Sequence, residues 1–330
     1  MLEAEEQIGA PVDLRSASLT LPTGGLHVAK PLWPAGSVSL NAPGAAGKST
    51  TARALSVSLA SGRVVIPGIE PIGAARPVLY VAAEDPVVHW HSRSVEAICR
   101  GIGIERSALL HPIELFDGRG RPLHRIARAL AERAADFGAV ILDSQQALLA
   151  QVDGNSGIRD RDSLFWHAID QLACPTFIIG HPNRSDSRDW QRADGRVAGS
   201  EVNRYRARMM WRATWRDEPA IVGTSFRRYT LVNVKNNHGA TEDPLGFATS
   251  WRHGTYDDPG VLTFTATEPD ATALPDGLSP AMRETMRHYQ EGATTPAALR
   301  EVMPSLSDDA ARQRLSRIRK HLGESMEGEA

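Results

Sequence analysis

Short runs rich in apolar residues alternate with segments of helical period along the first part of the chain. The runs predict strands at Gly36–Leu40, Val78–Ala82, Ala139–Leu142 and Thr176–Gly180. Apolar residues at helical spacing predict helices at Lys48–Ser61, Leu123–Asp136 and Asp162–Leu172, and a helix that ends within Glu96–Gly101. Strands that alternate with helices are typical of a mainly parallel sheet covered on both faces, so we expect an α/β core.

The pattern changes near Arg227. Successive strands separated by turns are predicted at Arg228–Val234, Pro244–Trp251 and Val261–Thr267. They predict an antiparallel extension of the sheet. Residues 1–30 show no clear period, and we expect them to pack on the core as an irregular arm.

A stretch rich in Pro, Asp and Ala, Thr267–Pro280, predicts an interdomain linker. Beyond it, helices are predicted at Pro280–Gln290, Pro296–Met303 and Asp308–Leu322. We therefore expect four parts, which are an arm (1–30), a core (31–266), a linker (267–280) and a small helical domain (281–330).

The composition is that of an ordinary globular protein, with 42% hydrophobic and 23% charged residues among 330. The formal net charge of −2 excludes a strongly cationic surface overall, so nucleic-acid binding would need a local patch. Cys99 and Cys174 have no CxxC partner, and we expect both to be buried apolar residues. The acidic N-terminus lacks the pattern of a signal peptide, and no apolar run approaches the ~18 residues of a membrane span, so we expect a cytoplasmic protein.

Residues Ala42–Ser49 read APGAAGKS, the Walker A pattern with alanine in place of the first glycine. A chance turn rich in Ala and Gly is the alternative, but a strand before the motif and a helix after it are the required context. Backbone N–H groups of such a loop surround a phosphate, and the helix directs its positive dipole end at the same charge. We expect Lys48 to bridge the β- and γ-phosphates of ATP and the Ser49 hydroxyl to bind Mg²⁺. The predicted nucleotide-binding residues are Pro43, Gly44, Ala45, Ala46, Gly47, Lys48, Ser49 and Thr50.

Three more polar residues follow predicted strands. Asp143 ends an apolar strand, as a Walker B aspartate does, and is expected to hold Mg²⁺ through water. Glu84 follows the strand that we expect beside the Walker A strand, where it would act as a general base or orient the attacking water. Its neighbour Asp85 is the weaker candidate, because aspartate suits a helix N-cap. His181 could hydrogen-bond the γ-phosphate, and a histidine that only caps the strand is the alternative.

Two polar segments are candidates for contact with nucleic acid. Gln151–Asp162 follows the Walker B strand, and Pro182–Ser200 follows His181. The second segment contains Trp190, which can stack on a base, and arginines that can contact phosphates, at Arg184, Arg188, Arg192 and Arg196. Aspartates interleave with these arginines, so a solvated loop without DNA contacts is the alternative.

The C-terminal helices resemble a helix-turn-helix or winged-helix unit. In the last helix, Ser307 is a suitable N-cap, and Leu315 and Ile318 belong to an apolar stripe. Much of the remaining surface is basic, and the candidate DNA contacts there are Arg312, Arg314 and Arg317. A charged helix that docks on the core or mediates assembly is the alternative.

The order of the motifs resembles that of the RepA-type hexameric helicases, RecA-like ATPases of plasmids, phages and mobile elements that are related to the DnaB replicative helicases. The resemblance covers about Leu32–Phe264 and rests on GSVSLNAPGAAGKST, VLYVAAEDP, AVILDS, TFIIGHPNR, VAGSEVNRYR and VKNNHG. It implies a RecA-like fold, a ring or filament with ATP at the subunit interfaces, and movement along single-stranded DNA. The catalytic residues that it implies are Lys48, Glu84, Asp143, His181 and Lys235.

By this resemblance, Lys235 is the lysine that one subunit extends towards the γ-phosphate held by its neighbour. The DnaB-like pattern often has an arginine two residues later, where this chain has Asn237. Either Lys235 acts alone, or Arg227 or Arg228 reaches over.

We expect an ATP-driven motor on DNA, a replicative helicase of a phage, plasmid or mobile element. A DNA-binding regulator whose ATPase controls assembly without unwinding is an alternative from a different class. A recombination or repair ATPase that forms filaments is another, and a phosphotransferase that acts on a small molecule is more distant.

Overall fold

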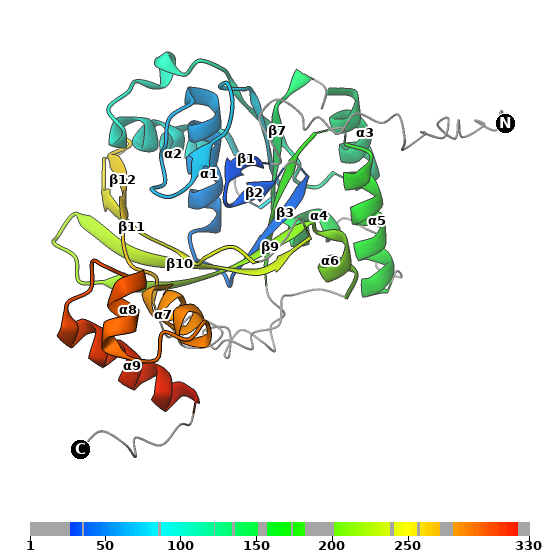
Figure 1. The fold of residues 1–330 in the computed structure, drawn as a ribbon. Coiled ribbons are helices and arrows are strands. Elements are labelled where there is room, and N and C mark those ends of the chain that lie inside the picture. The colour runs from blue at the N-terminus through cyan, green and yellow to red at the C-terminus, as the bar shows by residue number, and fades with distance from the viewer. Residues whose placement is uncertain are drawn as a thin grey trace.

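The computed structural model describes residues 27–34, 36–84, 87–121, 123–133, 136–150, 157–172, 174–181, 201–237, 241–255, 258–270 and 280–322. Within these residues, a nine-stranded sheet with the order β12-β11-β10-β9-β3-β8-β7-β5-β6 runs through the molecule (Figure 1). Its parallel part contains β3 (Ser37–Asn41), β5 (Val78–Ala82), β6 (Ile113–Asp117), β7 (Ala139–Asp143) and β8 (Thr176–Gly180).

The other part of the sheet is antiparallel, as predicted. It contains β9 (Met209–Glu218), β10 (Thr224–Asn236), β11 (Leu245–Arg252) and β12 (Val261–Ala266). The first of these strands pairs in parallel with β3 and antiparallel with β10, so it joins the two parts. This mixed α/β architecture agrees with the fold class expected from the sequence.

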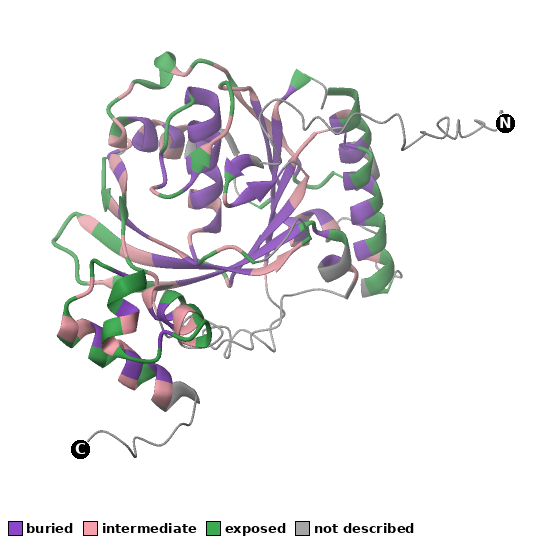
Figure 2. Cartoon of the chain, viewed as in Figure 1, coloured by how far each residue is buried: buried purple, intermediate pink, exposed green. Residues whose placement is uncertain are grey.

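Helices cover both faces of the parallel strands (Figure 1). One face carries α1 (Lys48–Ser61) and α2 (Val87–Gly101), and the other carries α3 (Leu123–Arg133), α4 (Gln145–Leu149), α5 (Ile158–Asp170) and α6 (Glu201–Arg206). Strand residues alternate between the two cores, because successive side chains of a strand point to opposite faces. In β5, Tyr80 packs on the α1 side, whereas Leu79 and Val81 pack on the α3 side. Both faces are buried, which explains the continuous apolar runs (Figure 2).

The structure corrects the start of one predicted helix, the end of the predicted loop before it and the description of the N-terminal arm. The helix predicted at Asp162–Leu172 begins earlier, at Ile158, so residues 158–162 of the predicted loop Gln151–Asp162 belong to α5. The arm predicted for residues 1–30 includes a strand, because β1 (His27–Lys30) pairs with β2 (Trp33–Pro34) and β4 (Glu70–Pro71) in a small sheet. Residues 1–26 lie outside the described part of the chain.

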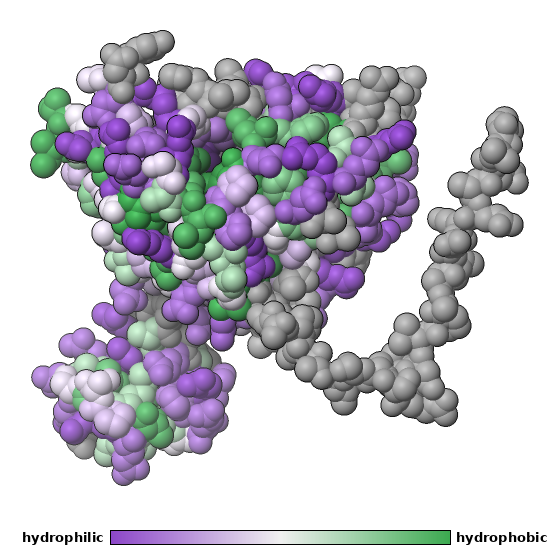
Figure 3. Space-filling model, turned by 90° about the horizontal axis from the view of Figure 1, so that it is seen from above, coloured by the Kyte–Doolittle hydropathy of each residue, from purple (hydrophilic) through white to green (hydrophobic). Residues whose placement is uncertain are grey.

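The C-terminal segment forms α7 (Pro280–Gln290), α8 (Pro296–Val302) and α9 (Asp308–Leu322), close to the predicted helices. Leu299, Ala311 and Leu315 form a core of their own, and these helices stand as a lobe beside the larger body in Figure 3. Ser307 caps α9 through its hydroxyl, which accepts from the N–H of Ala310 at 3.2 Å. The described residues of this segment contain no strand that could serve as a wing. No described helix is long and apolar enough to cross a membrane.

Candidate nucleotide-binding site

The loop between β3 and α1 has the backbone conformation of a tight anion-binding turn. Ala45 has a φ of 60° and Gly47 a φ of 72°, both in the left-handed region that residues other than glycine seldom adopt. A Cβ atom on Gly47 would lie 2.3 Å from the hydroxyl oxygen of Tyr229, so this glycine is required by its backbone and by its neighbour. The N-terminus of α1 follows at Lys48, where free N–H groups and the helix dipole favour negative charge.

Lys48 is held inside this loop. Its Nζ donates to the carbonyl oxygens of Ala42 and Pro43, both at 2.7 Å, and lies 3.5 Å from Nδ1 of His181. Only 5% of the lysine is exposed. Burial lowers the pKa of Lys48 to about 8, against the opposing effect of the carboxylates of Glu84 and Asp143. The ammonium therefore lies at the point where the loop, the Walker B strand and His181 converge.

Asp143 ends β7 with one carboxylate oxygen bonded and the other free. Its Oδ2 accepts from the hydroxyl of Tyr80 at 2.5 Å, whereas Oδ1 is buried and has no hydrogen-bond partner among the described residues. Burial raises the pKa of Asp143, and the hydroxyls of Tyr80 and Ser49 act against that shift. A buried carboxylate oxygen that lacks a partner, close to a serine hydroxyl, is a donor set that suits Mg²⁺. The residues present thus fit the predicted magnesium site.

Glu84 does not follow a strand beside the Walker A strand, as predicted, because β8 and β7 lie between β3 and β5. It nevertheless reaches the site. Glu84 Oε1 lies 3.0 Å from Nε2 of His181 and accepts a hydrogen bond from the hydroxyl of Ser144. Its pKa is lowered, first by the hydrogen bond from His181 and also by that from Ser144, so the carboxylate is ionised at neutral pH.

The residues after β7 bridge the ends of β5 and β8. Ser144 contacts Glu84, and Gln146 binds the backbone of His181 twice. The Gln146 amide accepts from the His181 N–H at 3.0 Å and donates to the His181 carbonyl at 3.2 Å. This pair fixes the position of His181 between Lys48 and Glu84. The sequence analysis missed Ser144 and Gln146, although their place directly after the Walker B strand could have pointed to them.

A cavity of about 510 Å³ extends from the loop onto the antiparallel strands. It is lined at one end by the loop, Thr50, Glu84 and His181, and at the other by Arg227, Tyr229 and Trp251. Arg227 donates to the carbonyl of Ala45 in its own chain and pairs with Asp217 at 2.6 Å. An aromatic and cationic wall of this kind suits a nucleotide base beyond the phosphates.

A family model described as an AAA domain matches residues 17–187, just over half of the chain. The chain belongs to the AAA domain family. A comparison with curated proteins finds no match.

Solved structures with a similar fold include a RadB recombinase, with 18% identity over 66% of this chain and 88% of that one and a TM-score of 0.44. A KaiC-like protein of Pyrococcus horikoshii OT3 has 11% identity over 74% and 99%, with a TM-score of 0.44. The flagellar accessory protein FlaH of Methanocaldococcus jannaschii has 14% identity over 70% and 90%, with a TM-score of 0.41. These matches include no RepA-type helicase, and the description of the fold rests on the strand order and the loop conformation given above.

The site brings together four of the five predicted catalytic residues, Lys48, Glu84, Asp143 and His181. The fifth, Lys235, does not line the loop cavity, and its Nζ donates to the carbonyl of Ala207 at 2.7 Å. Of the two arginines named as its substitutes, Arg227 binds its own loop and Arg228 pairs with Glu218 at 3.3 Å.

The predicted DNA contacts fall into two groups. The arginines of the segment after His181 lie outside the described residues, at Arg184, Arg188, Arg192 and Arg196. In α9, Arg312 pairs with Asp308 at 2.8 Å, and Arg317 is exposed. Arg314 turns towards α7, where its guanidinium donates to the Ala281 carbonyl and the Thr285 hydroxyl, both at 3.4 Å. Arg314 therefore stabilises the helical unit, which makes it a weaker candidate for DNA contact than its neighbours.

Proposed function

We propose that this AAA domain hydrolyses Mg·ATP and converts the hydrolysis into movement along single-stranded DNA, as a replicative helicase. The observation that carries the proposal is the contact series from Lys48 through His181 to Glu84. It places the lysine expected to bind phosphate near an ionised carboxylate that follows a different strand, which supports a role in ATP hydrolysis.

Each residue of the series has a role that its contacts support. If Nε2 of His181 carries the proton and donates to Glu84, then Nδ1 is free to accept from Lys48. Glu84 would then orient or deprotonate the attacking water, and Lys48 would bind the phosphates. Mg²⁺, held by Ser49 and Asp143, would supply charge neutralisation at the phosphates.

Strand displacement on a forked DNA duplex tests the motor function. We expect ATP-dependent release of one strand by the wild-type protein and none by Lys48→Ala. DNA binding that responds to ATP, without release of a strand, would instead identify a regulator. The arginine missing at Asn237 favours that second candidate, because a lone lysine stabilises transition-state charge less well than an arginine fork. Filaments on DNA in electron micrographs, with no unwinding, would favour a recombination ATPase.

We further propose that ATP is shared between subunits and that Lys235 acts on the nucleotide of a neighbour. The proposal is supported by the position of Lys235, which does not line the described part of its own loop cavity and whose Nζ donates to the Ala207 carbonyl. A cation supplied in this way contributes about 10³–10⁵ in rate when it is an arginine, and we expect less from a lysine. Lys235→Ala should therefore bind ATP and hydrolyse it poorly, whereas Lys30→Ala, which changes an exposed lysine of β1, should hydrolyse it normally.

Subunit mixing tests this sharing directly. When Lys235→Ala and Lys48→Ala are mixed and exchange of subunits is verified, some interfaces pair an intact loop with an intact Lys235. ATPase activity should then exceed that of either variant alone. A mixture no more active than its parts would refute the shared site while leaving nucleotide binding at Lys48 intact.

A further inference from the structure

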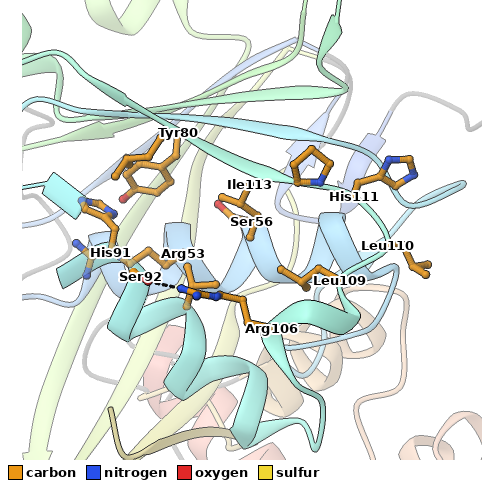
Figure 4. Close-up of a pocket in the computed structure, with 13 residues that line it drawn as sticks. Arg53, Ser56, Tyr80, His91, Ser92, Arg106, Leu109, Leu110, His111 and Ile113 are labelled. Carbon is orange, nitrogen blue, oxygen red and sulfur yellow. Dashed lines mark hydrogen bonds between the residues drawn. The ribbon is translucent and has the colours of Figure 1, made fainter. Parts of the chain in front are cut away.

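A second cavity, of about 460 Å³, lies on the α1 side of the sheet, and none of its described lining residues also lines the loop cavity. Its walls come from α1, α2, β5, β6 and the segment that begins with the short helix η1 (Arg106–Ala108) (Figure 4). The volume lies within the range of about 300–1,000 Å³ that is common for small-molecule sites. The size therefore permits a ligand, and the lining chemistry indicates its class.

His91 lines this cavity, and one of its two ring nitrogens is buried without a hydrogen-bond partner among the described residues. The residue is only 5% exposed, and its Nδ1 accepts from Nε of Arg53 at 3.1 Å. Because Nδ1 accepts, the proton of the neutral ring must lie on Nε2, and this atom is buried without a hydrogen-bond partner among the described residues. Burial and the charge of Arg53 lower the pKa of His91 to about 3, so the ring stays neutral at neutral pH. A buried N–H without an acceptor costs stability, which a ligand oxygen would restore.

Two arginines, Arg53 and Arg106, line the cavity, and no carboxylate lines it within the part of the chain that the structure describes. Arg106 stands at the rim, where it donates to the hydroxyl of Ser92 and lies 3.8 Å from Glu96, which partly offsets its charge. Most of the remaining wall is apolar and is formed by Val95, Leu109, Leu110, Ile113 and Leu115. An apolar wall with cationic groups and one N–H donor is complementary to an amphipathic anion.

We propose that this cavity binds a small apolar molecule that carries a carboxylate group. The carboxylate faces Arg106 and the N–H of His91, and the apolar body faces β6. A neutral molecule of the same shape would lack the charge attraction to Arg106, whose charge Glu96 offsets only in part, and a cation would be repelled. The assignment rests on Arg106 and His91, which do not line the loop cavity.

The cavity is also joined to the nucleotide site by two short connections. The ring of Tyr80 lines the cavity, while its hydroxyl donates to Asp143 Oδ2 at 2.5 Å. Arg53 lines it from α1, four residues after Ser49. A ligand that moves either residue changes the surroundings of Asp143, so its binding and that of Mg·ATP are coupled in both directions. This second step rests on the proposed nucleotide function, whereas binding to the cavity does not.

Titration calorimetry on the full chain, with octanoate as the probe, tests the binding step. We expect saturable binding of octanoate, at least tenfold weaker binding of octanol, and none of octylamine. Arg106→Glu should weaken octanoate binding at least tenfold, and His91→Leu should do the same. Arg128→Glu, which reverses an exposed arginine of α3, is the matched control and should bind octanoate as the wild type does. Circular dichroism should show the same folded state for each variant.

Two results would overturn the site. One is the absence of saturable octanoate binding by the folded wild type, and the other is equal affinity of wild type and Arg106→Glu. Displacement of octanoate by ATP in direct competition would also overturn it, by placing the probe in the loop cavity. Lys48→Ala should still bind octanoate, which separates this site from the nucleotide function.

The coupling step has its own readout. Saturating octanoate should change the dissociation constant of a fluorescent ATP analogue by about 5- to 150-fold, the usual range for linked sites. An unchanged constant with octanoate bound would refute the coupling and leave the cavity site standing. Failure of the wild type to bind the analogue at all would refute the nucleotide function, while calorimetry would still decide on the cavity.

Discussion

Substitution of Gly47 by alanine tests whether the nucleotide loop requires a glycine at this position. The new Cβ would lie 2.3 Å from the Tyr229 hydroxyl oxygen and 2.8 Å from two of its ring carbons, on a backbone with a φ of 72°. Tyr229 cannot move aside easily, because it is 4% exposed and its ring stacks on that of Phe247 at 5.0 Å. A left-handed residue other than glycine costs about 1–2 kcal/mol, and overpacking of a buried site costs about 1–3 kcal/mol.

We therefore expect Gly47→Ala to lower the free energy of unfolding by roughly 2–5 kcal/mol. The matched control lies in the same loop, where a Cβ on Gly44 would meet nothing within 4 Å and the backbone is not left-handed. Gly44→Ala should leave the free energy of unfolding within about 1 kcal/mol of the wild type or raise it slightly.

Urea unfolding without nucleotide, followed by tryptophan fluorescence, measures both variants. Tyr229→Phe in the Gly47→Ala background removes the nearest of the three clashing atoms and should recover part of the loss. Equal stability of Gly47→Ala and Gly44→Ala would refute the argument, as would a loss that Tyr229→Phe leaves unchanged.

Three further predictions concern the site and the C-terminal segment. Lys48→Ala should abolish ATP binding or turnover. Circular dichroism should show an intact fold, because Nζ of Lys48 contacts loop carbonyls rather than a core cluster. Turnover near that of the wild type would contradict this prediction. Glu84→Gln should bind nucleotide and not hydrolyse it, because only the charge that acts on water is removed, and loss of binding in an equilibrium assay would reassign Glu84 to a structural role. Deletion of Leu274–Ala330 should leave ATPase activity measurable and weaken DNA binding, with the salt dependence reduced by roughly one unit of slope for each DNA phosphate that the segment neutralises. Unchanged affinity and slope would make the segment an assembly or docking element.

The bounds of α7 and α9 agree with their predicted limits, although the burial of their residues is mixed. The bounds of α1, β5 and β8 also agree, because every residue of the two strands is buried and α1 lies between two left-handed glycines, Gly47 and Gly62. The sequence analysis missed β6, whose residues are all partly exposed at the edge of the sheet. It also missed β9, where Arg212 is fully buried within the strand and interrupts the apolar pattern.

The sequence predicted which site residues lie at the ends of strands. It did not predict the contacts that depend on the order of the strands in the sheet. Asp143 and His181 follow parallel strands, and the carboxyl ends of such strands share one edge of the sheet. The sequence analysis placed Glu84 at this edge of the sheet but expected its strand to lie beside the Walker A strand. The order of strands along the chain does not determine their order in the sheet, where β8 and β7 lie between β3 and β5. The contact of Gln146 with His181 depends on that same order, so no local pattern could show it.

The Gln146–His181 pair gives a physical route from the nucleotide to DNA in the proposed motor. Gln146 lies in α4, which ends just before the segment Gln151–Asp162, and His181 directly precedes Pro182–Ser200. The two segments predicted to contact DNA thus begin close to residues that hold each other by two hydrogen bonds. Lys48 lies 3.5 Å from the His181 ring, so its transfer from the loop carbonyls to a phosphate changes a contact of this pair. Because the Gln146 side chain holds the His181 backbone by both bonds, we expect a shift of His181 to strain or break them, and this contact is the route that the proposed motor would use.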